Sequence, residues 1–296
     1  MTAYTGHAGS KVILLGEHGV VHGTDALVVG LQTGLSATAT QADEFSVSIP
    51  DWSLSNRDIL QKLCEAFGRM FDILECRGAR IAFKVNADIP SRAGLGASAS
   101  LGMACARATC GLLNLDADEE LIFNAVLSFE NVFHHNSSGV DIRAVARTGC
   151  GVYHRKRGYQ PLAAPIPSLM VIHSGAPGAT RDTVLKFERR LQTHRLASSQ
   201  LKRIQDMVRV GVDALMSKDT AALGKAMNEV QDALCWFDMS TDALDHICQL
   251  ALNAGALGAK LTGGGGGGCA IALLAEEGQR EEMKRKFADA GYRVVM

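Results

Sequence analysis

Small and hydroxyl-bearing residues fill the segment "ADIPSRAGLGASASLGMACARA", residues 87–108, between a proline and an apolar run. Gly94 and Gly96 lead into Ser98 and Ser100, and the residues beyond them favour a helix. The first backbone N–H groups of a helix lack intrahelical acceptors and lie at the positive end of its dipole, so they bind anions. A serine N-cap after a turn would use the same residue types, and both can hold at once. The segment predicts a backbone cradle for phosphate.

Charged side chains that could act on such a ligand stand near the start of the chain. The segment "GSKVILLGEHGVVHG", Gly9–Gly23, is expected to form a strand carrying Lys11 and then a turn carrying Glu17 and His18. A lone lysine at the start of a strand is usually solvated, so its function depends on what lies beside it.

Two carboxylates occur in "FENVFHHNSSGVD", with Glu130 near a helix end and Asp141 on the turn that follows Ser-Ser-Gly. A carboxylate on such a turn suits a catalytic or metal-binding role, although aspartates are also common in surface turns. Glu130 and His134 stand four residues apart, but no third nitrogen or sulfur ligand is spaced to complete a zinc site. Magnesium, which takes oxygen ligands and phosphates, fits this pattern better.

A run of six glycines, 263–268, lies between two apolar segments that both read as strands. A dinucleotide-binding fingerprint would need a helix after the glycines, so we exclude it. A flexible linker is not expected between two strands of one domain. A tight turn that lets the backbone approach a ligand explains the run best. The lysine of a Walker loop and the HRD and DFG signatures of protein kinases are absent from the sequence.

The elements that must position these residues follow an α+β order, with strands clustered early. The pattern predicts strands over 11–16, 26–31, 45–50, 80–85, 149–156 and 168–174, and helices over 57–71, 98–113 and 116–134. Helical segments are then expected over 184–217, 219–235 and 240–254, and after them strand 257–262, strand 269–274, helix 276–290 and strand 292–296. The segment 162–167, "LAAPIP", is the best boundary candidate, which gives domains 1–165 and 166–296.

Composition favours a small-molecule partner. The 296 residues are 47% hydrophobic and carry a net charge of -1, so no overall basic field argues for nucleic acid or a membrane surface. The longest apolar run, residues 269–275, is far short of a membrane span, and no signal-peptide pattern opens the sequence, so a cytoplasmic protein is expected. Eight scattered cysteines without a CxxC pair favour reduced thiols over zinc or disulfides.

Taken together, "KVILLGEHGVVHG", "IPSRAGLGASAS" and "KLTGGGGGGCAIAL" resemble, in order and spacing, the three motifs of the GHMP small-molecule kinases. "SSGVD" lies between the second and third motifs, and the resemblance covers most of the chain. It implies a two-domain α+β fold, with a left-handed βαβ unit in the N-terminal ATP-binding domain and a ferredoxin-like C-terminal domain. It also implies that MgATP phosphorylates a small alcohol. The first motif and "HSGAPGATRDTV" are most similar to members that phosphorylate the 5-hydroxyl of mevalonate, in isoprenoid precursor biosynthesis.

The resemblance also implies roles for residues. Asp141 would face the substrate hydroxyl with Lys11 beside it as the catalytic pair, while Ser98 and Glu130 hold Mg²⁺. The remaining sites fall into two groups: ATP-binding Gly94, Leu95, Gly96, Ala97, Ser98 and Ser100, and substrate-binding Lys11, Glu17, His18, Asp141, Thr180, Gly264 and Gly265.

Several positions depart from the family pattern. Gly9-Ser10 replaces the usual Pro-Gly before the lysine, and the other departures are Ala97, His135, Ser137, Ile142 and Arg143. Arg143 would add positive charge for an acceptor that already carries phosphate, which keeps 5-phosphomevalonate or another small alcohol open as the acceptor. A metabolite sensor without turnover is the alternative from another class. The oligomeric state, a homodimer included, feedback control and nucleotide selectivity are left open.

Overall fold

The computed structural model describes residues 2–50, 52, 57–134 and 137–296, and His135 lies outside these ranges. The chain forms two compact units, and each is built from several stretches of sequence. The first unit comprises Met1–Lys11, Gly30–Ser91 and Gly96–Thr148, and the second comprises Val12–Val29, Arg92–Leu95 and Gly149–Met296. The division into domains after residue 165 stays a prediction.

Two long strands, β1 (Ala3–Leu15) and β2 (Ala26–Gln41), contribute residues to both units. In the first unit β1 pairs with β2, β2 runs antiparallel to β4 (Ile81–Ala87), and β4 runs parallel to β3 (Ser46–Ser48). Because β3 and β4 are parallel and α1 (Arg57–Ile73) connects them, they form the expected βαβ unit.

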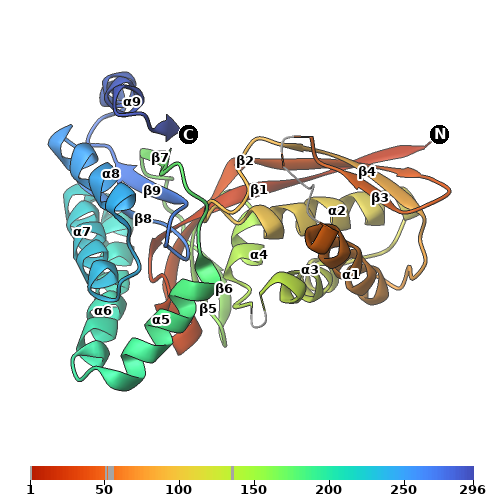
Figure 1. The fold of residues 1–296 in the computed structure, drawn as a ribbon, viewed down its shortest axis with the longest axis horizontal. Coiled ribbons are helices and arrows are strands. Elements are labelled where there is room, and N and C mark those ends of the chain that lie inside the picture. The colour runs from red at the N-terminus through yellow and green to blue at the C-terminus, as the bar shows by residue number, and fades with distance from the viewer. Residues whose placement is uncertain (1, 51, 53–56, 135–136) are drawn as a thin grey trace. The chain divides into compact units, whose positions relative to one another are not determined.

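Three helices of the first unit pack on one another and on this sheet: α1, α2 (Ala97–Leu113) and α3 (Glu119–Phe133) (Figure 1). Phenylalanine rings form the core between them, with Phe67 of α1 stacked on Phe83 of β4 and edge-on to Phe129 of α3. The first turn of α3 is acidic, as predicted, and the Asp118 side chain caps it by accepting from the backbone N–H of Leu121.

A short helix absent from our predictions, α4 (Val140–Val145), carries Asp141 in its first turn. We expected this aspartate on an open turn. Gly139, with φ of 81°, precedes the helix in the left-handed conformation, so the Ser-Ser-Gly turn starts a helix that is too short to show periodicity.

The second unit contains the expected ferredoxin-like sheet. Its antiparallel strands lie in the order β10-β7-β9-β8, which is fourth, first, third, second along the chain. Helices α7 and α8 pack on β8 (Figure 1). The elements of this unit that follow β2 are the hairpin β5 (Gly149–His154) and β6 (Gly158–Pro161), then β7 (Leu169–His173), α5 (Thr180–Thr193), α6 (Ala197–Ser217), α7 (Thr220–Trp236), α8 (Asp242–Asn253), β8 (Gly258–Leu261), β9 (Cys269–Leu273), α9 (Arg280–Asp289) and β10 (Arg293–Val294).

The continuous helix expected over 184–217 is wrong, because α5 ends at Thr193 and α6 begins at Ala197. His194 adopts an extended conformation there, and its Nδ1 accepts from the backbone N–H of Leu196, so the side chain stabilises the turn between the helices.

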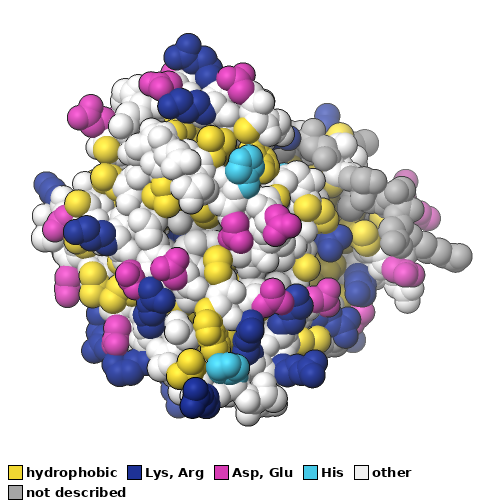
Figure 2. Space-filling view, turned by 60° about the vertical axis from the view of Figure 1, so that its left-hand side comes forward, with side chains coloured by type: hydrophobic (Ala, Val, Ile, Leu, Met, Phe, Trp, Pro, Cys, Tyr) yellow, Lys and Arg dark blue, Asp and Glu magenta, His cyan; other side chains and the backbone are white. Residues whose placement is uncertain are grey.

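Positive and negative side chains are intermixed on the face drawn in Figure 2, with hydrophobic side chains scattered between them. This fits the nearly neutral net charge. Among the residues that the structure describes, no helix is both long and apolar enough to cross a bilayer. All eight cysteines are described, and all are free thiols.

Candidate functional site

Lys11 and Asp141 form an ion pair inside the first unit, with Lys11 Nζ 3.0 Å from Asp141 Oδ1. The lysine is almost fully buried in β1, whereas the aspartate side chain keeps 31% of its surface exposed. A solvent-facing carboxylate with an enclosed cation behind it can accept a hydrogen bond from a ligand.

Gly96 lets the lysine lie against the start of α2. A Cβ at this position would stand 3.0 Å from Lys11 Cγ and 3.1 Å from a methyl of Val145, and the backbone φ of 74° also favours glycine. We predicted that the glycines of this loop bind the ligand. The structure shows that Gly96 is needed by the packing of Lys11, and that a Cβ on Gly94 would meet the Thr262 carbonyl oxygen at 2.5 Å.

Helix α2 begins after Gly96 without a side-chain cap. Its first N–H groups have no intrahelical acceptors, as at every helix start, and they suit an anion. Leu95 and Ala97 are buried, so they would contribute backbone only, while Ser98 is half-buried. Ser100 is different from our expectation: its buried hydroxyl donates to the carbonyls of Gly9 and Gly96, which makes it a support of the loop rather than a phosphate ligand.

Glu130 of α3 lies buried beside Ser98, with which its side chain hydrogen-bonds. Burial raises the pKa of this carboxyl to about 8, and the nearby Asp141 contributes to the rise. Its Oε1 has no hydrogen-bond partner among the described residues. A buried carboxyl oxygen without a partner, next to a serine hydroxyl, would suit a magnesium ion that takes its other ligands from phosphates and water. The described residues hold no cluster of three or more His, Cys, Asp or Glu that would suit a metal held by protein alone.

Glu17 is placed differently from our prediction of a substrate ligand. It lies in the second unit with no exposed surface, ion-paired to the equally buried Lys260 of β8. Lys260 Nζ also donates to the carbonyl of Leu261 at 2.6 Å. The pair therefore ties the turn after β1 to β8, and the substrate-binding role of Glu17 stays a prediction. Sequence reasoning missed Lys260, although a single lysine within the apolar "GALGAKL" was a signal.

His18 is held tightly in the same unit. Its φ of 57° and ψ of -40°, with the bond from Gly19 N–H to the Glu17 carbonyl, define a classic γ-turn, a rare and strained conformation. The imidazole stacks on Phe187, and Nε2 donates to the carbonyl of Gly264 at 2.9 Å. Burial lowers the pKa of His18 to about 4, so the ring is neutral and Nδ1 is its acceptor.

The glycine run packs against the protein's own backbone and side chains. A Cβ on Gly264 would stand 2.5 Å from Thr180 Oγ1, and one on Gly265 would stand 2.3 Å from the Met239 carbonyl oxygen. Within the second unit, the structure thus brings together His18, Gly264 and Thr180, the last at the exposed start of α5.

Two departures from the family pattern can now be placed. Arg143 pairs with Glu120 at 2.5 Å and lies 3.7 Å from the centre of the Phe123 ring, so its charge is directed to α3. Ile142 is fully buried in the core. In the ligand-free structure the charge of Arg143 is thus engaged with α3, and Ile142 offers no polar group to a phosphate on the acceptor.

Two family models match this chain: GHMP kinases N terminal domain over residues 57–149, and GHMP kinases C terminal over residues 212–293. Together with the fold and the loop at α2, these matches show that the chain belongs to the GHMP kinases, a family of small-molecule kinases.

Within this family, the curated relatives to which this chain is similar include several mevalonate kinases. The chain is 28% identical to that of Aeropyrum pernix, covering 91% of this chain and 88% of the relative, and 28% identical to that of Pyrococcus horikoshii, covering 93% and 89%. A crystal structure of L. major mevalonate kinase in complex with R-mevalonate has 27% sequence identity and a TM-score of 0.84, over 98% of this chain and 92% of that one.

Proposed function

We propose that this protein is a mevalonate kinase, which transfers the γ-phosphoryl group of ATP to the 5-hydroxyl of mevalonate and supplies 5-phosphomevalonate for isoprenoid precursors. The observation that carries the proposal is the ion pair of Lys11 with the half-exposed Asp141, in the same unit as the uncapped start of α2. The similarity to mevalonate kinases, one of them bound to R-mevalonate, supports the acceptor.

Asp141 orients the 5-hydroxyl and accepts its proton as the oxygen attacks the γ-phosphorus. The bond from this phosphorus to the new oxygen forms, the bond to the bridging oxygen breaks, and ADP leaves. Phosphoryl transfer needs mainly alignment and neutralisation of charge on the transferring oxygens. Lys11 supplies positive charge beside both the carboxylate and the reacting hydroxyl.

The backbone N–H groups at Gly96–Ser98 would hold the triphosphate. Ser98 and Glu130 would hold Mg²⁺, which supplies charge neutralisation on the phosphate oxygens. Because the unliganded Glu130 carboxyl has a raised pKa, cation binding at this site would release a proton. Substrate-side contacts in the second unit would come from His18 and Thr180.

The test is ATP consumption by the purified protein with mevalonate, 5-phosphomevalonate, homoserine and galactose in parallel, with the product identified by ³¹P NMR. We expect turnover with mevalonate, and a loss of at least about a hundredfold in kcat for Asp141→Asn, the scale of a positioned general base. Arg143→Gln is the matched control on the same helix, and it should keep near-normal activity because Arg143 faces α3.

Two other results would change the proposed acceptor or the proposed class of protein. Turnover only with 5-phosphomevalonate would move the acceptor, and ATP binding without turnover would favour a metabolite sensor. A cytoplasmic location and a homodimer stay predictions, and light scattering of the purified protein tests the second.

A further inference from the structure

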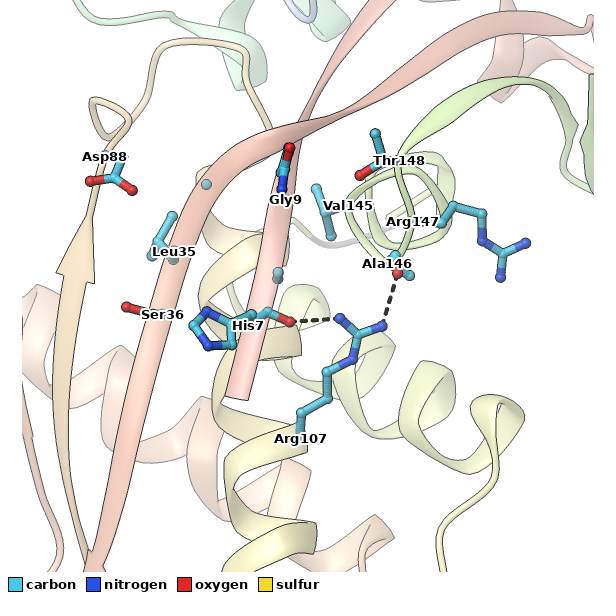
Figure 3. Close-up of a pocket in the computed structure, with 13 residues that line it drawn as sticks. His7, Gly9, Leu35, Ser36, Asp88, Arg107, Val145, Ala146, Arg147 and Thr148 are labelled. Atoms are coloured by element: carbon cyan, nitrogen blue, oxygen red, sulfur yellow. Dashed lines mark hydrogen bonds between the residues drawn. The ribbon is translucent and has the colours of Figure 1, made fainter. Parts of the chain in front are cut away.

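Arg107 lies on α2, and its guanidinium reaches two other elements of the first unit. One terminal nitrogen donates to the carbonyl of His7 at 2.6 Å, and the other donates to the carbonyl of Ala146 at 2.9 Å (Figure 3). The two acceptors stand 100 and 39 residues away along the chain. A planar guanidinium fixes both donors in one plane, so it also fixes the spacing of the two carbonyls.

The two carbonyls belong to the segments that carry the candidate catalytic pair. His7 lies in β1, the strand that carries Lys11, and Ala146 directly follows α4, the helix whose first turn carries Asp141. Arg107 itself is on the helix that begins at the phosphate loop. One side chain therefore connects the three elements that must be aligned for phosphoryl transfer.

Helix α4 needs such support. It has only six residues, and isolated helices this short are not stable in water. The last carbonyls of a helix lack intrahelical donors and carry partial negative charge, so a cation that donates to the residue capping the end is favourable. Without Arg107, the end of α4 would lose this bond and one of the contacts that set its distance from β1.

We propose that Arg107 is a positioning residue, which holds β1 and α4 so that Lys11 and Asp141 stay in contact on the side of the substrate hydroxyl. This inference rests on the proposed kinase function for its consequence, but the contact itself can be measured without turnover.

Arg107 lies beside a cavity, which allows chemical rescue by a small cation as a control. The residue lines a cavity of about 340 Å³ together with the backbone of β1 and the segment after α4 (Figure 3). Removing its side chain therefore leaves a space that a small cation can enter from outside. Arg147 lines the same cavity but pairs with the exposed Glu119, so it serves as the matched control.

We expect Arg107→Ala to lower kcat roughly 10- to 100-fold, because small misplacements of reacting groups cost this much. The KM values for ATP and the acceptor should stay within about twofold, since Arg107 is not among the residues that we propose to bind either ligand and its guanidinium donates to backbone carbonyls. Added guanidinium at millimolar concentration should restore part of kcat in Arg107→Ala and none in Asp141→Asn. The kcat of Arg107→Lys, whose ammonium can donate to one carbonyl but not to both, should lie between those of Arg107→Ala and the wild type. The kcat of Arg147→Ala should be close to that of the wild type.

The readout independent of turnover is the NMR signal of the Lys11 ammonium, assigned with Lys11→Met. In the wild type its chemical shift should differ from those of exposed lysines. In Arg107→Ala the chemical shift should move toward those values, and added guanidinium should restore the wild-type value. If wild-type protein shows no turnover with any acceptor, the proposed function fails while this measurement still decides the role of Arg107. An unchanged Lys11 signal and unchanged kcat in folded Arg107→Ala would overturn the inference. If the alanine variant does not fold, Arg107→Lys decides by the same two measurements.

Discussion

At the scale of single residues, the candidate site combines a buried lysine, Lys11, with the accessible carboxylate of Asp141. Lys11 is enclosed by β1 and by Gly96 of the loop before α2, whereas Asp141 keeps about a third of its side chain exposed. This division suits a reaction in which the aspartate must meet a substrate and the lysine must not leave its place. Glu130 adds a second buried ionisable group, whose charged form the ligand-free protein disfavours because burial raises its pKa to about 8.

Glu130→Gln should make the ligand-free protein more stable above neutral pH while abolishing magnesium-dependent activity. The unfolded carboxyl ionises near 4.5 and the folded one near 8, so the folded state binds the proton more tightly. Its stabilising contribution is complete below pH 4.5 and is lost as the pH rises to 8, with an upper bound of about 5 kcal/mol. Urea unfolding of wild type and variant at pH 5 and pH 8, without nucleotide, measures this. A free energy of unfolding with the same pH slope in both proteins would contradict it.

At this scale, the sequence allowed site residues to be proposed where they lie in a local motif, and their roles stay predictions. The positions of Ser98, Glu130 and Asp141 follow from the loop, one helix and one turn, and the structure brings them near Lys11. Glu17 was assigned to substrate because its burial depends on Lys260, 243 residues away. No local pattern reports such a partner.

At the scale of elements, the loop before α2 is shaped by two left-handed glycines, and their needs differ from those of glycines elsewhere. Gly96 combines a positive φ with close contacts to Lys11 and Val145, whereas Gly78 has a similar φ of 79° and no atom within 4 Å of a built Cβ. Comparing alanine substitutions at Gly96 and Gly78 therefore distinguishes two free-energy costs. The cost of the left-handed backbone arises at both positions, and the cost of displacing Lys11 arises only at Gly96.

Gly96→Ala should lower both stability and kcat, while Gly78→Ala should lower stability alone. An alanine in the left-handed conformation lowers the free energy of unfolding by about 1 to 2 kcal/mol at either position. Only the alanine at position 96 would also contact the side chain of Lys11. Thermal unfolding and steady-state kinetics of the two variants measure the difference. Equal kcat in Gly96→Ala and Gly78→Ala would show that the loop tolerates the methyl group without moving the lysine.

Most elements were predictable from their pattern of apolar residues, including α1, α2, α3 and most strands of the two sheets. Strand β6 (Gly158–Pro161) was absent from our predictions, and two further errors have physical causes. Helix α4 is too short to show a period, and the break between α5 and α6 depends on one histidine side chain that accepts from the backbone. Such capping contacts override the helical propensity of the surrounding residues.

At the scale of the whole molecule, neither unit is a continuous piece of chain. Val12–Val29 and Arg92–Leu95 belong to the second unit while the residues around them belong to the first. Glu17 and Lys260, both in the second unit, are therefore supplied by the two ends of the sequence. Their ion pair makes the second unit depend on residues synthesised early.

Lys260→Met should reduce the free energy of unfolding by about 3 to 5 kcal/mol, because it removes the partner of a buried carboxylate. The double variant Lys260→Met, Glu17→Leu should recover most of this loss, since a well-packed apolar pair often replaces a buried ion pair without cost. Urea unfolding of the single and double variants tests the expectation. A double variant no more stable than the single one would show that packing at this site, rather than charge pairing, limits stability.

The 243-residue separation of this ion pair also has a consequence in time. At about 5 to 20 residues per second, a ribosome makes Lys260 on the order of 10 to 50 seconds after Glu17. The turn after β1 cannot reach its final buried state during this interval, because its carboxylate has no counter-charge to enter an apolar interior with. The nascent chain must keep that turn hydrated until β8 emerges, and the speed of translation between Glu17 and Lys260 sets how long it waits.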